Sequence, residues 1–208
     1  MAVDPAFLDY RSELLENLSA QEVRDVYPDD LLLWAAGSGS PSPEAPGRFF
    51  CCLEYRERKK FLEGEAPRGV SANAAIIAGL NAAAERIRRP CRVCVIPVAQ
   101  LGFQKAFRGK GPNGPELLRF LETLADNGCA LTEVQFSGGA GEIKARISAA
   151  DPTGGAANRL EREKSRAQNA VSDYKRQVYR ECLSRVEGIL VSCGVDEEIL
   201  GRIRCLEP

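Results

Sequence analysis

The sequence contains no histidine, and three long stretches of it contain no acidic residue. These stretches run from Leu31 to Pro43, from Ala66 to Ala84 and from Arg86 to Pro115. The lack of histidine excludes imidazole as a general base and as a metal ligand. The lack of Asp and Glu excludes, within each stretch, the carboxylate oxygens that magnesium prefers. Any chemistry in these stretches must use other groups.

Other features that the sequence lacks exclude whole classes of protein. No apolar run approaches the roughly 18–20 residues that cross a bilayer, so we expect no membrane segment. The start, Met1-Ala2-Val3-Asp4-Pro5, lacks the basic and then apolar pattern of a secretory signal. The formal net charge of −1 excludes a protein that coats nucleic acid by bulk attraction, although a local basic face is compatible with it.

The eight cysteines do not form the pattern of a secreted disulfide scaffold. Cys51, Cys52, Cys91 and Cys94 lie in apolar runs, where cysteine behaves as a small buried hydrophobe. Cys91 and Cys94 form a C-x-x-C with no second pair at zinc-finger spacing. We therefore expect no structural metal, no cofactor and a reducing intracellular compartment. Nucleus or cytoplasm is favoured over secretion, and the mitochondrion is left open.

The hydrophobic pattern of residues 29–152 predicts one α/β domain. The segment before it, residues 1–28, reads as two short helices, and Ser19-Ala20-Gln21-Glu22 has the form of a capping box for the second. The first three strands of the domain are expected to form an antiparallel meander. The patterns predict strands at 31–36, 48–55, 59–64, 92–98 and 130–136, and helices at 70–87, 100–108 and 116–127.

Residues 153–208 differ in composition and predict a helical arm. Residues 156–191 are charged and periodic, and one unbroken helix of that length would span roughly 50 Å. Gly194 ends the pattern, and Asp196 and Glu197 suit the start of a final short helix through Ile203. The sequence leaves open whether the long helix is continuous or bends into a hairpin.

The order of elements and several short strings resemble ribonuclease H over residues 30–151. Trp34-Ala35-Ala36-Gly37-Ser38 stands where the family has T-D-G-S on its first strand, and Ala78-Gly79-Leu80 matches its first helix. Ile96-Pro97-Val98-Ala99-Gln100 is similar to the T-D-S that ends the fourth strand, and Ser137-Gly138-Gly139-Ala140-Gly141 to the later G-H-x-G. A Lys-Gly-Pro after the following helix resembles the RNase H domains of trypanosomatid non-LTR retrotransposons, which implies a retrotransposon-derived chain.

The resemblance implies an RNase H-like mixed five-stranded sheet flanked by helices, with the N-terminal helical segment and the long C-terminal arm added. In the active family four carboxylates hold two magnesium ions. Carried over, the first aspartate becomes Ala36 and the helix glutamate Ala72, or Ala74 in a shifted register. The fourth-strand aspartate becomes Val98 or Ala99, and the last becomes Ala149 or, in another alignment, Asn158.

From these positions we expect no metal site, no catalytic residue and no enzymatic activity, that is, a pseudoenzyme. The alternative to this expectation is a hydrolase whose metal ligands lie at other positions of the chain. The carboxylates available to it are Glu63, Glu65, Glu142 and Asp151, whose spacing does not bring them together.

Basic residues mark candidate nucleic-acid contacts, because in the family the helix after the fourth strand faces the nucleic-acid backbone. The other interpretation is that these cations are ordinary solvated surface charges. The candidates are Arg56, Arg58, Lys59 and Lys60; Arg88 and Arg89; and Lys105, Arg108 and Lys110.

The arm carries the candidate protein-binding residues, an apolar stripe at helical spacing. The stripe either pairs with another chain or folds back onto its own domain. It comprises Leu160, Val171, Tyr174, Val178, Val186 and Ile189. Our leading hypothesis is a catalytically inactive RNase H-like scaffold subunit of an intracellular nucleic-acid-processing complex, with no prediction of its oligomeric state. The alternative is a non-catalytic binding module for RNA, DNA or an RNA–DNA hybrid.

Overall fold

The computed structural model describes residues 8–16, 18–152 and 156–204, and of residues 156–163 and 202–204 it describes the backbone alone. Its centre is a six-stranded sheet in the order β1-β6-β5-β2-β3-β4. The strands are β1 (Tyr10–Leu15), β2 (Leu31–Ser38), β3 (Pro46–Tyr55), β4 (Arg58–Arg68), β5 (Arg92–Pro97) and β6 (Ala130–Phe136).

The strand directions confirm the predicted RNase H-like arrangement, although the sheet has six strands and not the predicted five, because β1 adds a strand at its edge. β2, β3 and β4 form the antiparallel meander. β5 then pairs with β2, and β6 with β5, both parallel, because a helix carries the chain back across the sheet before each of them. Period-two alternation places neighbouring residues on opposite faces of the sheet.

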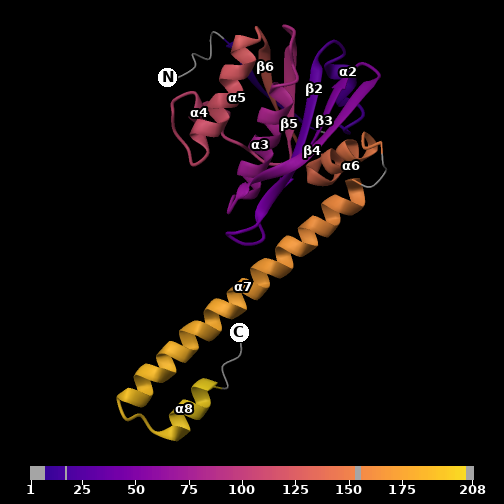
Figure 1. Cartoon of the computed structure of the whole chain (residues 1–208). Coiled ribbons are helices and arrows are strands. Elements are labelled where there is room, and N and C mark those ends of the chain that lie inside the picture. Colours follow the sequence, from indigo (N-terminus) through magenta and orange to yellow (C-terminus); the bar gives the residue numbers. More distant parts are fainter. Residues whose placement is uncertain (1–7, 17, 153–155, 205–208) are drawn as a thin grey trace.

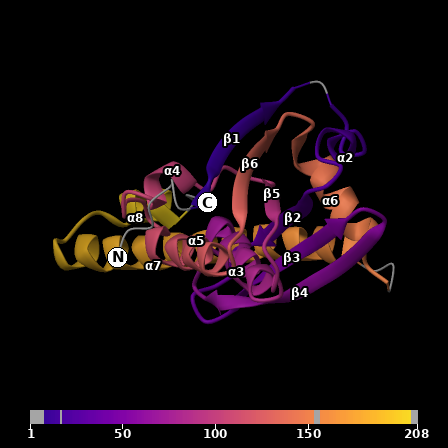
Figure 2. The same ribbon diagram turned by 90° about the horizontal axis from the view of Figure 1, so that it is seen from above.

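Helices cover both faces of the sheet (Figure 2). One core contains Leu33 and Ala35 of β2 with apolar residues of the helices on that side, α3, α4 and α5. The other contains Trp34 and Ala36 of β2 with residues of α2 and α6. The helices are α2 (Val23–Val26), α3 (Ala72–Ala84), α4 (Phe103–Ala106), α5 (Gly114–Asp126), α6 (Gly139–Ala149), α7 (Ala156–Ser192) and α8 (Glu197–Arg204).

Glycine allows α3 to lie close against the meander. A Cβ on Gly79 would stand 2.8 Å from Sγ of Cys51 and 3.0 Å from Cβ of Phe49. A Cβ on Gly37 of β2 would stand 2.9 Å from the backbone nitrogen of Ile76. Such distances leave no room for a side chain, so these glycines determine how near the helix comes to the strands.

The predicted N-terminal helical segment is wrong in its first half. Residues 10–15 form β1, an edge strand that runs parallel to β6. Long-range pairing with β6 overrides the local helical spacing of this segment, as tertiary contacts often do. The second half is confirmed as a helix, since the backbone N–H of Ser19 donates to Glu22 Oε2 at 2.7 Å just before α2.

Two other elements differ from the prediction. The helix expected at 100–108 is only the short α4, because Gly102 before it has a left-handed φ of 80°. Helix α6 was not predicted, since the glycines at its start favour a loop by local propensity. It forms because Ile143 and Ile147 pack into the core beside Trp34.

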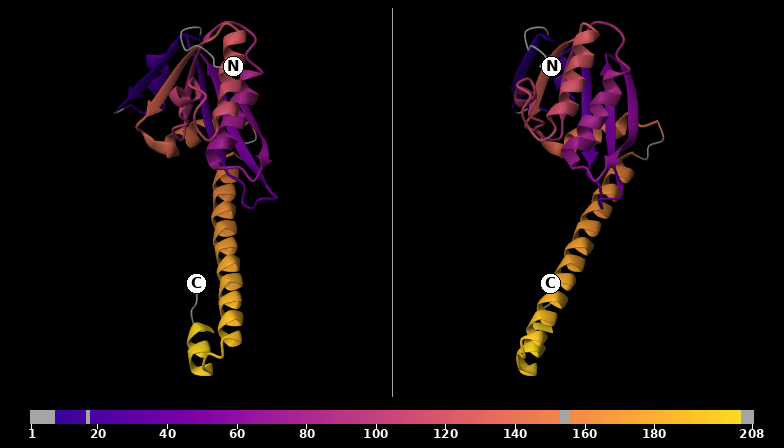
Figure 3. Two further views of the ribbon diagram at one scale, coloured as in Figure 1. Left: turned by 90° about the vertical axis from the view of Figure 1, so that its left-hand side faces the viewer. Right: turned by 60° about the vertical axis from the view of Figure 1, so that its left-hand side comes forward.

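The arm is a continuous helix that projects away from the domain (Figures 1 and 3). α7 has 37 residues, and the short α8 folds back beside its far end. This confirms the predicted long helix and decides against a bend within it. No helix in the described part of the chain is long and apolar enough to cross a membrane.

Candidate functional site

The positions of the family's first and third carboxylates meet at the carboxyl ends of β2 and β5. The backbone N–H of Val98 donates to the carbonyl oxygen of Ala35 at 3.0 Å, which places Val98 beside Ala36. Ala36 is 0% exposed and belongs to the core with Trp34 and Phe50. The position predicted for the first aspartate is therefore filled by packed apolar side chains.

The position of the helix carboxylate lies against the same end of β2. A Cβ on Gly39 would stand 2.9 Å from the backbone nitrogen of Ala72, so the first turn of α3 adjoins the strand end. Ala72 is exposed, and Ser71 caps the helix by accepting from the N–H of Ala74 at 3.2 Å. Ala149 is exposed at the end of α6, whereas the side chain of Asn158 lies outside the described residues.

These residues do not fit a magnesium ion. Magnesium needs oxygen ligands, and Ala36, Ala72 and Val98 offer none from their side chains. Among the residues that the structure describes, no three His, Cys, Asp or Glu side chains converge on a point that could hold a metal ion. Glu142, one of the carboxylates available to a rearranged site, accepts the backbone N–H of Ala20 at 2.8 Å.

The arm lies against this end of the sheet. A hollow of about 450 Å³ separates Gly39, Ser40 and Ala72 from α7. Its α7 wall consists of Ala167, Gln168, Val171, Ser172 and Lys175. The first half of α7 thus passes beside Ala72, the predicted position of the helix carboxylate, before the helix leaves the domain. The periodicity of the sequence did not predict this contact. It indicates which residues share a helix face, but not which part of the domain that face contacts.

The structure separates the predicted basic groups. The β3–β4 turn with Arg56, Arg58, Lys59 and Lys60 lies at the end of the sheet where β2 and β5 begin, and the Arg88 and Arg89 loop lies there too. Ala36 and Val98 lie at the opposite end. Arg56 pairs with Asp29 at 3.5 Å and has its guanidinium 5.3 Å from the ring centre of Tyr55.

The third basic group lies at the other end, near α3. Lys105 and Lys110 line a hollow of about 290 Å³ together with Asn73, the neighbour of Ala72. Arg108 is exposed on the same loop. Only this group adjoins the family's catalytic position.

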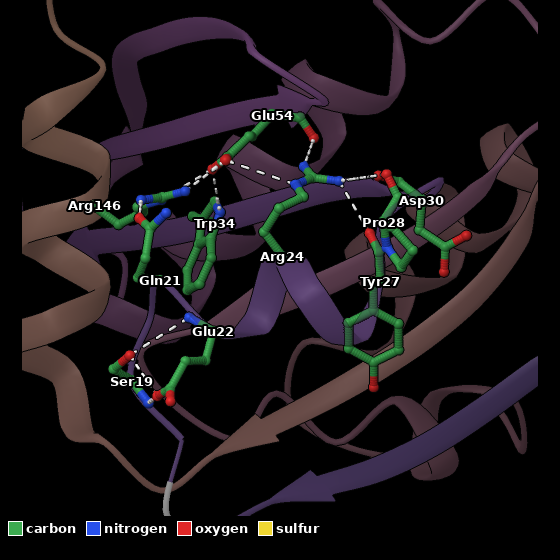
Figure 4. A network of polar contacts seen from close by, with 10 residues as sticks. All are labelled: Ser19, Gln21, Glu22, Arg24, Tyr27, Pro28, Asp30, Trp34, Glu54 and Arg146. Atoms are coloured by element: carbon green, nitrogen blue, oxygen red, sulfur yellow. Dashed lines mark hydrogen bonds and ion pairs between the residues drawn. The ribbon is translucent and has the colours of Figure 1, made fainter.

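A buried charge network links α2, β3 and α6 on one side of the sheet (Figure 4). Glu54 on β3 is 2% exposed and receives Arg146 of α6 through two bonds, Nη2 to Oε1 at 2.6 Å and Nε to Oε2 at 3.0 Å. Arg24 of α2 lies 3.8 Å from Oε1 and also donates to the Glu54 carbonyl at 2.6 Å. Trp34 Nε1 donates to Oε2 at 3.3 Å.

This network positions α6, from which the arm departs. Local sequence patterns did not predict this network, although one signal of it is present. Glu54 ends an otherwise apolar run from Phe49 to Leu53, and a charge inside such a run implies a charged partner elsewhere.

A second buried carboxylate should make stability depend on pH. Burial raises the pKa of Glu133 above 4.5, against the lowering effect of the 2.5 Å hydrogen bond from the Tyr10 hydroxyl. The folded chain then holds more protons than the unfolded chain between 4.5 and the raised pKa, so the free energy of unfolding falls as pH rises through that window.

We expect Glu133→Gln to remove this fall. Urea unfolding of both proteins at steps between pH 4 and pH 8 should show the variant gaining stability relative to the parent as pH rises. A constant difference between the two curves across the range would contradict the assignment to Glu133.

No protein-family model and no curated protein matches the sequence. Among solved structures, the chain is similar to the N-terminal RNase H domain of Rv2228c from Mycobacterium tuberculosis, solved as a fusion with maltose-binding protein. The identity is 18%, over 68% of this chain and 99% of that one, with a TM-score of 0.38. It is also similar to RNase H1 from the halophilic archaeon Halobacterium salinarum NRC-1, at 16% identity over 58% and 93% of the two chains, with a TM-score of 0.37.

The prediction that the chain is not an enzyme is corrected by these findings. The similar structures are RNase H domains, and the apolar residues at Ala36, Ala72 and Val98 do not establish inactivity. At such identities the likeness concerns the fold alone. The strand order and strand directions of this chain are those of an RNase H-like fold.

Proposed function

We propose that this chain is an RNase H-like subunit of an intracellular nucleic-acid-processing assembly and binds a protein partner through α7. The observation that supports the proposal is the exposure of the apolar stripe. Its side chains are between 38% and 61% exposed, far above the level of a packed helix face. They are Tyr174, Val178, Val186 and Ile189, together with Val171, which also lines the hollow between α7 and Ala72. The side chain of Leu160 lies outside the described residues.

The fold-back helix α8 does not cover the stripe. Leu200 of α8 is 2% exposed, and the backbone N–H of Val195 donates to the carbonyl of Leu190 at 3.1 Å in the connecting turn. Leu183 and Leu190 of α7 are half-buried there. Val186 and Ile189 of the stripe remain 45% and 61% exposed beside them. The helix tip is thus stabilised on one face and leaves the other free for a partner.

The spacing of the stripe suits a long, nearly straight contact. Val171, Tyr174 and Val178 of the stripe and the exposed Cys182 after them follow one another by three, four and four residues, an eleven-residue unit. This period of about 3.67 residues per turn keeps the apolar side chains on one face over the length of a helix. A second helix could lie along it without strong supercoiling.

The partner is expected to contact the apolar stripe, because the charges beside it nearly balance. Between Val171 and Ile189 the helix has four cationic and three acidic side chains. An amphipathic helix with charges of both signs beside its apolar face would complement this surface. The cations are Lys175, Arg176, Arg180 and Arg185, and the acids are Asp173, Glu181 and Glu187.

We expect Val178→Asp to abolish partner binding, because it places a charge in the middle of the apolar contact. The control is Ser184→Asp, which adds the same charge to an exposed position outside the stripe. Tagged full-length chains would be purified from native cells, and the captured proteins quantified by mass spectrometry, with circular dichroism to verify folding. A partner retained equally by both variants would contradict the proposal.

Residual nucleic-acid binding is the second candidate, favoured by the position of Lys105 and Lys110 beside Asn73 and Ala72. If these lysines contact phosphates, Lys105→Gln with Lys110→Gln should weaken binding to an RNA–DNA hybrid. The slope of log K against log salt should become shallower by about two. Gel shifts over a salt series measure both, with Lys59→Gln and Lys60→Gln at the opposite end as control. No shift of duplex, hybrid or single strand at low salt would eliminate this function.

A further inference from the structure

The geometry points to Cys91 and Cys129 as a thiol pair that a small disulfide, such as glutathione disulfide, converts into an internal disulfide bond. Their sulfur atoms are 3.9 Å apart. Cys91 immediately precedes β5 and Cys129 immediately precedes β6, and the backbone N–H of Ala130 donates to the Cys91 carbonyl at 3.0 Å. The register that pairs Arg92 with Ala130 makes the two cysteines neighbours across adjacent parallel strands. The usual strand spacing of about 4.7–4.9 Å falls within the Cα separation of roughly 4.4–6.8 Å that a disulfide spans.

Strand alternation explains why Cys91 faces Cys129 and not Cys94, its partner in the C-x-x-C pattern. Residues three apart on a strand point to opposite faces. Cys91 packs with the core of α3 and α5, and Cys94 belongs to the core on the other side of the sheet. The thiol of Cys94 donates instead to Asp30 Oδ2 at 3.3 Å.

The two thiols differ in solvent exposure, and this difference decides which of them reacts with the oxidant first. Cys129 is 4% exposed, and its thiol lies 3.7 Å from the Arg89 carbonyl oxygen. Cys91 is only half-buried, so an oxidant in solution reaches it first. Arg88 and Arg89 are exposed shortly before Cys91 and favour the approach of an anionic disulfide such as glutathione disulfide, whereas Arg92 is paired with Asp9 at 2.7 Å.

The exchange balances in two steps. The Cys91 thiolate attacks one sulfur of the oxidant and forms a mixed disulfide, and the first small thiolate leaves and takes up the proton that Cys91 lost. The Cys129 thiolate then attacks the Cys91 sulfur and expels the second small thiol, which takes up the proton of Cys129. Two protein thiols are oxidised to one disulfide, and one small disulfide is reduced to two thiols.

The rate should depend strongly on pH. Burial, and after it the neighbouring Cys129, raises the pKa of Cys91 to about 12, so only a small fraction is thiolate at neutral pH. Below that pKa the thiolate fraction, and with it the rate, rises about tenfold for each pH unit. The product joins the starts of β5 and β6 and closes a loop that contains α4 and α5, which restrains the unfolded chain.

The test treats the native full-length chain with millimolar glutathione disulfide between pH 7 and pH 9, followed by alkylation and peptide mapping. We expect a Cys91–Cys129 crosslink that appears faster at higher pH, disappears with dithiothreitol and raises the melting temperature until reduced. Cys94→Ser should still form it, and Cys129→Ser should stop at glutathionylated Cys91. A Cys91–Cys94 bond, or no internal bond involving Cys91 after full reaction at pH 9, would overturn the proposal.

Discussion

Glu54→Gln should lower the free energy of unfolding by about 3–5 kcal/mol, the cost of leaving a buried charge without its partner. The carboxylate is 2% exposed, and the two guanidinium side chains that it pairs with, on Arg24 and Arg146, are 14% and 12% exposed. Glutamine keeps the shape of the side chain and removes the charge. Both cations would then be confined between α2, β3 and α6 with no anion to offset them.

Urea unfolding followed by circular dichroism measures the loss. The matched control is Glu57→Gln in the exposed β3–β4 turn, expected to change stability by less than about 0.5 kcal/mol. Replacing the pair together, as Glu54→Leu with Arg146→Met, should restore much of the stability, because an apolar pair needs no compensation. A loss below about 1 kcal/mol for Glu54→Gln would show that water reaches the network and that it does not determine the position of α6.

Ala36→Asp should destabilise the domain by about 3 kcal/mol or more, because it buries a carboxylate with no partner. Ala36 is 0% exposed beside Trp34 and Phe50, and the adjacent Val98 supplies no ligand from its side chain. In a magnesium-dependent relative the same aspartate would be held by the metal. The stability of Ala36→Asp with and without magnesium therefore shows whether this end of the sheet retains space for an ion or is filled by apolar side chains.

The measurement is urea unfolding at pH 7 with and without 10 mM magnesium. The control is Ala72→Glu at the exposed first turn of α3, which should leave stability unchanged or raise it by a few tenths of a kcal/mol through the helix dipole. If magnesium restores the stability of Ala36→Asp, a cation site persists here and the apolar filling is not complete. Cleavage of a labelled RNA–DNA hybrid by the unmodified chain would show directly that catalysis uses other ligands.

Most elements of the domain follow from local patterns. Continuous apolar runs predict the central strands β2 and β5, and the capping box of Ser19 and Glu22 predicts α2. These patterns depend on neighbours within a few residues, so they are readable without the fold. The charged, periodic composition of residues 156–191 likewise predicts α7, including its length.

The wrong predictions of local structure share a physical cause. Residues 10–15 become a strand because they pair with β6, more than a hundred residues later in the chain. Helix α6 forms despite its glycines because Ile143 and Ile147 fill the core over Trp34. In both cases a contact distant in sequence contributes more free energy than the local propensity opposes, and no local pattern records such a contact.

The candidate sites likewise depend partly on the local sequence and partly on contacts between distant elements. The sequence by itself determined the residue types: no acidic side chain in three long stretches, an apolar stripe on the arm and a cysteine pair three residues apart. Only the tertiary structure decided what those residues meet. It packed Ala36 in one core with Trp34, left most of the α7 stripe exposed and placed Cys91 next to Cys129. Periodicity along a chain specifies which side chains share a face, whereas the neighbour of that face depends on how the elements pack together.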